Sequence, residues 1–145
     1  MNIYTVNAVK SFMGREGYGF NANLLENKKK VAFVINEGNG GCFNWQWYDK
    51  DARKRFYDHI ATMPEHSEYP IEFDDHVIAV LIDDYDFDKK MKRICKKQTV
   101  FTINDNKDYK ALNVKYVSEN IDSIIKYLSD KFGTGNFEII NKKYI

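Results

Sequence analysis

The six residues from Asn36 to Gly41 are the part of the chain whose types and spacing best suit binding chemistry. They contain three glycines and two asparagines. Regular secondary structure is excluded there, because each glycine loses much conformational freedom on folding. Two interpretations stay open: a tight structural turn, or a loop whose main-chain N–H groups bind an anion or approach a ligand. The spacing matches neither a P-loop nor the dinucleotide fingerprint, so it identifies no ligand class.

An aromatic run, CFNWQWY, follows this turn at residues 42–48. In a strand, Phe43, Trp45 and Trp47 would share one face. Rings that face helices would belong to the core, whereas exposed rings beside the glycine turn would form a recognition surface. Both interpretations stay open. The candidate ligand- or partner-binding residues are Arg15, Tyr18, Asn36, Gly38, Asn39, Gly40, Gly41, Trp45 and Trp47.

The residues that usually perform catalysis or bind metals show no diagnostic spacing. The three histidines form no HxxxH or HExxH pattern, and the two cysteines, Cys42 and Cys95, are far apart. The acidic run at residues 84–88 lacks the glycine and the final glutamate of a calcium loop. We therefore predict no catalytic residue, no metal and no cofactor, and a binding protein in place of an enzyme.

Composition limits the class of protein. A chain of 145 residues is long enough for one domain, which we place at residues 1–145. With 22 basic and 21 acidic residues, the net charge of +1 gives no general attraction to nucleic acid or to anionic membranes. No apolar run approaches the roughly 18 residues of a membrane span, and the N-terminus lacks the pattern of a signal peptide. We expect a cytoplasmic protein that does not associate with membranes.

The first half of the chain has the pattern of an antiparallel β-meander followed by helices. Strands are predicted within residues 2–12, 20–24, 31–35 and 42–48, with a glycine-rich connection at residues 13–19 and a hairpin turn at Asn27. Asp49 is a suitable N-cap for a helix that Pro64 ends. A second helix begins at Asp74, and Asp86 or Asp88 would begin a further helical piece.

The second half predicts a hairpin and one more helix. Residues 98–103 and 109–116 form the hairpin strands, and an apolar stripe predicts a helix from Ile121 to Phe132. Gly133 ends that helix, and residues 137–140 form a short strand. The predicted class is α+β, with helices packed on one face of the N-terminal meander and a second, C-terminal hairpin.

Five stretches of the chain stand out together: GYGFNANL (17–24), KKVA (29–32), NEGNGG (36–41), TVFTI (99–103) and KFG (131–133). They resemble one group of small proteins of tailed phages and mobile elements, for which no activity is established. It implies a phage-type accessory protein that works in the cytoplasm of an infected or host bacterial cell. Small phage proteins without catalytic motifs often act against host immunity, and by this analogy we expect a counter-defence role.

Three functions follow as hypotheses. The first is non-catalytic binding, as a counter-defence inhibitor of a host immune effector. The second is sequestration of a nucleotide second messenger by Gly38 to Gly41, neighbouring aromatic rings, and Arg15 or a lysine. The third is an enzyme that acts on nucleotides or nucleic acid. The expected partner is thus a host immune protein or a small nucleotide; a nucleic acid is less favoured, no membrane is expected, and a homo-oligomer stays open.

Overall fold

A computed structural model of the protein describes residues 3–68, 71–104 and 106–144. Within these ranges the chain forms three α-helices and seven strands in two antiparallel sheets, which confirms the predicted α+β class. The chain divides into two compact units, residues 1–86 and residues 87–145. Each unit is described by itself, and the expectation of one domain over residues 1–145 stays a prediction.

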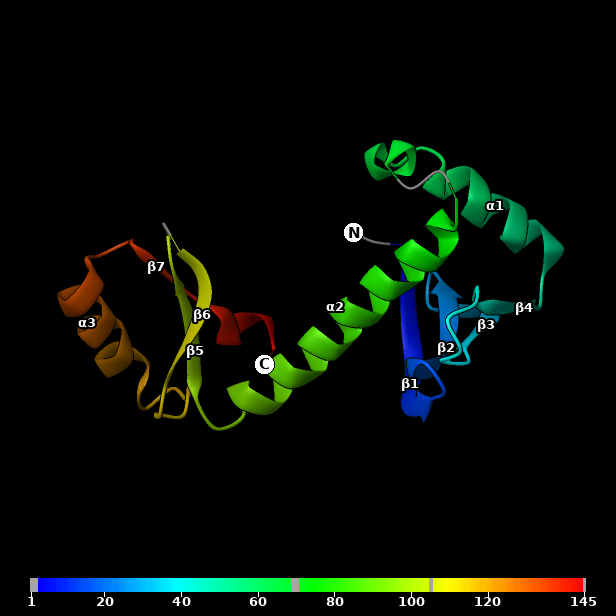
Figure 1. The fold of residues 1–145 in the computed structure, drawn as a ribbon. Coiled ribbons are helices and arrows are strands. Elements are labelled where there is room, and N and C mark those ends of the chain that lie inside the picture. Colours follow the sequence, from blue (N-terminus) through cyan, green and yellow to red (C-terminus); the bar gives the residue numbers. More distant parts are fainter. Residues whose placement is uncertain (1–2, 69–70, 105, 145) are drawn as a thin grey trace. The chain divides into compact units, whose positions relative to one another are not determined.

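Unit 1 begins with a four-stranded antiparallel meander, sheet A, in the order β1-β2-β3-β4 (Figure 1). Its strands are β1 (Tyr4–Gly14), β2 (Gly17–Glu26), β3 (Lys29–Asn36) and β4 (Asn44–Trp47). The prediction of a glycine-rich connection at residues 13–19 was wrong, because β1 and β2 continue almost to the turn that joins them. Met13 pairs with Tyr18, and Gly14 pairs with Gly17.

The turn between β2 and β3 was predicted correctly at Asn27. Asn27 and Lys28 have φ angles of 48° and 69°. Two consecutive positive φ angles are the geometry of a type I′ turn, whose twist matches that of the paired strands. The turn sets the pairing of Glu26 with Lys29 and of Leu25 with Lys30, and the register then shifts by one residue between Leu24 and Leu25.

Two helices follow sheet A. Helix α1 (Lys50–Ile60) begins after Asp49, whose side chain accepts a hydrogen bond from the Asp51 N–H, as the N-cap prediction requires. A short 3-10 helix, η1 (Pro64–Ser67), leads to α2 (Phe73–Cys95). The expected break at Asp86 or Asp88 was wrong: the acidic first turn and basic last turn belong to one continuous helix.

The helices of unit 1 cover one face of sheet A, here called the inner face. Its buried core contains Leu24 and Val34 from the sheet, Phe56 from α1, and Ile78 from α2. Among the described residues of unit 1, the core that packs against α1 and α2 lies on this inner face, and the site described below lies on the opposite, outer face.

Unit 2 is a smaller sheet with a helix against it (Figure 1), together with the last residues of α2, whose Met91 packs with Val100 and Ile140. Its strands β5 (Thr99–Ile103), β6 (Asn106–Leu112) and β7 (Phe137–Ile139) lie in the order β6-β5-β7. Helix α3 (Ile121–Phe132) ends at Gly133, whose φ is 93°, and a 3-10 helix, η2 (Ile140–Lys143), follows β7. The second hairpin and the final helix are thus confirmed.

Candidate functional site

The glycine turn is held by its own hydrogen bonds. The Gly38 N–H donates to Asn36 Oδ1 at 3.0 Å, and the Gly41 N–H donates to Asn39 Oδ1 at 3.2 Å. The Gly38 carbonyl accepts from the Glu16 N–H at 2.8 Å. These N–H groups therefore have partners within the chain, which favours the structural interpretation of the turn over an anion-binding one.

The same turn lies directly against the β1–β2 turn. A Cβ placed on Gly14 would lie 2.5 Å from the Gly38 carbonyl oxygen, and one on Gly38 would lie 2.8 Å from Gly14 Cα. Gly38 also has a φ of 70°, which costs other residues strain. Glycine is required at both positions because two main chains meet there.

The two tryptophans belong to the inner face. Their rings stack with centroids 5.5 Å apart and planes 6° apart, and both contact Phe56 of α1. Trp45 and Trp47 are half-buried against the core of unit 1. The core interpretation of the aromatic run therefore describes these rings better than an exposed recognition surface does.

Asp75, in the first turn of α2, anchors the entry to β4. Its carboxylate accepts from the Phe43 N–H and from Trp45 Nε1, each at 3.0 Å. Burial raises the pKa of Asp75, while these two hydrogen bonds oppose the rise. The carboxylate thus holds one end of β4 on the helix.

Cys42, Glu72 and Asp75 form the one group among the described residues that has the geometry to hold a metal ion. One ligand atom from each lies within 4.8 Å of the others. Cys42 Sγ donates to Glu72 Oε1 at 2.8 Å, and this hydrogen bond raises the pKa of the thiol. A protonated thiol is a donor and not a thiolate ligand, and Asp75 already serves Phe43 and Trp45. The group is explained as a link between the glycine turn and α2.

The outer face of sheet A shows a different chemistry, ordered in rows across the strands. One row joins Asn7, Asn23, Phe33 and Gln46, in that order from β1 to β4. Because paired residues point to the same face, these four side chains stand side by side. The Asn23 amide donates to the Asn7 amide oxygen at 3.0 Å, which confirms that both lie on this face.

Two further rows complete the surface. The second joins Lys10, Asn21, Ile35 and Asn44, and the third joins Thr5, Leu25 and Lys30. The Lys30 ammonium lies 5.1 Å from the centroid of the Tyr48 ring, which extends the third row beyond β4. We call these three rows, with Tyr48, the amide face.

Several amide side chains of the amide face are available to hydrogen-bond with a ligand. Among the described residues, no hydrogen bond occupies the side chains of Asn21, Asn44 and Gln46. None of the residues in its rows is acidic, and its two charges are the lysines of β1 and β3. Free amides, one exposed aromatic ring and two cations together suit an uncharged or anionic partner that is rich in donors and acceptors.

The predicted site residues fall into three places. Arg15 and Tyr18 are exposed at the β1–β2 turn, and 75% of Tyr18 is accessible. The glycine turn, from Asn36 to Gly41, lies against that hairpin end, so the structure does bring these two predicted groups together. The tryptophans lie on the inner face, away from the amide face.

The amide face itself was missed by sequence reasoning. Alternation in FNANL (20–24) and NWQW (44–47) places the amides opposite the core residues. That pattern was sufficient to find one amide stripe on each strand. It was not sufficient to show that the stripes align, since alignment depends on the register between distant strands.

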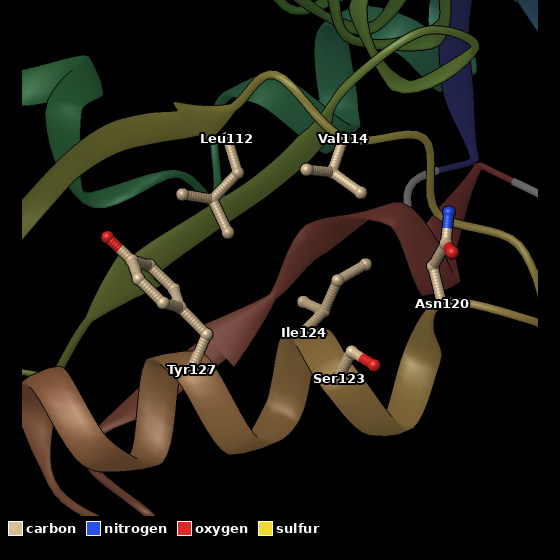
Figure 2. Close-up of a pocket in the computed structure, with 6 residues that line it drawn as sticks. All are labelled: Leu112, Val114, Asn120, Ser123, Ile124 and Tyr127. Carbon is tan, nitrogen blue, oxygen red and sulfur yellow. The ribbon is translucent and has the colours of Figure 1, made fainter.

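Unit 2 holds a separate apolar pocket of about 290 Å³. Figure 2 shows Leu112 and Val114 on one side, with Ile124 and Tyr127 of α3 on the other. Asn120 and Ser123 complete its lining, so none of its six side chains is charged. Nothing in its lining selects a ligand class.

No protein-family model, curated protein or solved structure matches this chain. Within the residues that the structure describes, no helix has both the length and the apolar content to span a membrane.

Proposed function

We propose that the protein acts by non-catalytic binding, and that the amide face binds a nucleotide-containing ligand. The observation that carries this proposal is the alignment of five amide side chains with two lysines and no acidic residue. Asn and Gln amides pair well with base edges, because they offer a donor and an acceptor together. Tyr48, which is 52% exposed, supplies a ring on which a base can stack.

This geometry favours the nucleotide hypothesis over inhibition of an effector protein. The centres of protein interfaces usually contain clustered aromatic anchors, and both tryptophans of unit 1 are directed into its core. The resemblance to phage proteins gives the proposal its setting, in which the protein would sequester a nucleotide signal of the host as a counter-defence measure.

The first experiment is fluorescence anisotropy with labelled single-stranded oligonucleotides, together with thermal stabilisation by a panel of linear and cyclic nucleotides. The affinity should depend only weakly on the salt concentration. Two lysines that contact phosphates predict a slope of about −1.4 for log K against log salt. A slope several times steeper would place the binding elsewhere.

Variants then locate the site. Tyr48→Ala should weaken binding by at least about fivefold, since removal of a stacking ring costs roughly 1–3 kcal/mol. Gln46→Glu, of nearly the same shape, should also weaken it by adding a negative charge to the face. Tyr109→Ala is the matched control, because Tyr109 lies in unit 2 and is 48% exposed. If both tyrosine variants bind alike, the amide face is not the site.

A time course separates binding from catalysis. The proposal predicts that the nucleotide is recovered unchanged after long incubation with the protein. Steady consumption of nucleotide would instead support the enzyme hypothesis.

A further inference from the structure

A concave site also lies in unit 1, where the first half of α2 meets Met63 and Glu65, and it shares no residue with the amide face. This α2 pocket has a volume of about 310 Å³. Its lining consists of Met63, Glu65, Phe73, His76, Val77, Val80, Leu81 and Asp84. The proposed function does not use it, so the two sites can be tested independently.

The floor of the α2 pocket is apolar and well supported. Phe73, Val77 and Leu81 are 4–7% exposed and belong to the core of unit 1. The Phe73 ring contacts two histidine rings, with centroid distances of 5.2 Å to His66 and 5.8 Å to His76. Val80 is unlike these residues: it is 45% exposed at the pocket wall. An apolar ligand would cover this side chain.

The charges around the pocket have one sign. Glu65 and Asp84 contribute the two carboxylates of its lining, both exposed; among the described residues no lysine or arginine lines it, and His76 is its other titratable group. Cations are attracted to such a rim and anions are repelled by it, with modest strength because the groups are solvated. The pocket therefore distinguishes ligands by the charge of their polar group.

We propose that the α2 pocket binds a small cationic amphiphile, an apolar chain or ring that carries one ammonium group. The apolar part lies on Phe73, Val77 and Val80, and the ammonium group lies between the rim carboxylates. Each buried methylene should strengthen binding roughly fourfold. The ammonium group should add roughly two- to fivefold over a neutral group at low salt.

The test uses hexylamine, hexanol and hexanoate, three probes with the same carbon chain and different polar groups. Binding to the full-length protein is measured from the methyl NMR signals of Val77, Val80 and Leu81. The pH is kept above the ordinary histidine pKa of about 6.5. Hexylamine should shift these signals and bind two- to fivefold tighter than hexanol, whereas hexanoate should bind more weakly than either. Propylamine should bind far more weakly than hexylamine.

Two variants make the result specific. Asp84→Asn should reduce the preference for hexylamine over hexanol, and Asp84→Asn combined with Glu65→Gln should bring the two affinities close together; neither change should unfold the protein, since both carboxylates are exposed. Val80→Trp should block the pocket, and Val114→Trp is its control, because Val114 is 43% exposed in unit 2. Absence of hexylamine binding, equal binding of all three probes, or an unchanged preference in Asp84→Asn would each overturn the proposal.

Discussion

The contact between the two turns of unit 1 gives a sharp prediction for Gly38. Gly38→Ala should lower the free energy of unfolding by about 1–5 kcal/mol. A residue with a side chain pays roughly 1–2 kcal/mol at positive φ, and the φ of Gly38 is 70°. The added Cβ would also lie 2.8 Å from Gly14 Cα and from the Gly17 carbonyl oxygen. Because both are main-chain atoms, the turns must separate, at a further cost of roughly 1–3 kcal/mol.

One term opposes this loss. Replacing glycine by alanine restricts the unfolded chain and stabilises the folded state by about 0.4–1 kcal/mol. The net loss is therefore about 1–5 kcal/mol, a substantial fraction of the roughly 5–15 kcal/mol by which domains are stable.

Urea unfolding followed by tryptophan fluorescence measures the change, since Trp45 and Trp47 report on the core of unit 1. Gly41→Ala is the matched control from the same turn. Its Cβ would meet no main-chain atom within 4 Å, and the nearest contact is the flexible Asn39 side chain at 3.3 Å. We expect Gly41→Ala to stay within about 0.5 kcal/mol of the parent protein. Equal stability of the two variants would refute the view that the glycine turn is structural.

Three further predictions test the framework around the sites. Asp75→Ala should lower the free energy of unfolding by about 2–3 kcal/mol, because the Phe43 N–H and Trp45 Nε1 lose their acceptor. Asp83→Ala removes an exposed carboxylate and should lower it by less than about 0.5 kcal/mol, as measured by urea unfolding. Asn141→Leu should destabilise unit 2 by about 2–4 kcal/mol, because this buried side chain accepts from the Val100 N–H and donates to the carbonyls of Cys95 and Gln98. Amide hydrogen exchange at β5 measures this loss of stability, and unchanged protection would contradict the prediction. Hydrogen bonds from the Arg55 guanidinium, and one from Tyr4, lower the pKa of Glu26. The contribution of Glu26 to stability is therefore present above the unfolded pKa of about 4.3 and is lost as pH falls through the lower folded value. The acid unfolding curve of Glu26→Gln should be flatter than that of the parent protein in that range, and superimposable curves would contradict the assignment.

Local signals in the sequence were sufficient for much of the fold. Asn27 identifies a hairpin turn, whose type the structure then shows, Asp49 identifies a helix start, and Gly133 identifies a helix end, because each depends mainly on its own backbone geometry. The alternation of Phe20, Ala22 and Leu24 with asparagines identified a strand with one buried face.

Features that depend on distant partners were not predicted. The demand for glycine at residue 38 comes from Gly14 on another hairpin, and the length of β1 and β2 comes from pairing up to Gly14 and Gly17. Helix α2 continues through its acidic stretch as far as Cys95. The local sequence at residues 86 and 88 instead predicted the start of a separate helix. The amide face likewise requires the register of four strands, which no single stretch of sequence contains.

The most direct test of the proposed function is a titration of isotope-labelled protein with the nucleotide that stabilises it most in the thermal panel, observing the side-chain NH₂ signals of Asn21, Asn44 and Gln46. If the amide face binds the nucleotide, these signals should shift together and saturate with one affinity, while those of Asn120 and Asn136 in unit 2 stay fixed. Saturable binding that leaves the three amide-face signals unchanged, or no binding at all, would contradict the proposal.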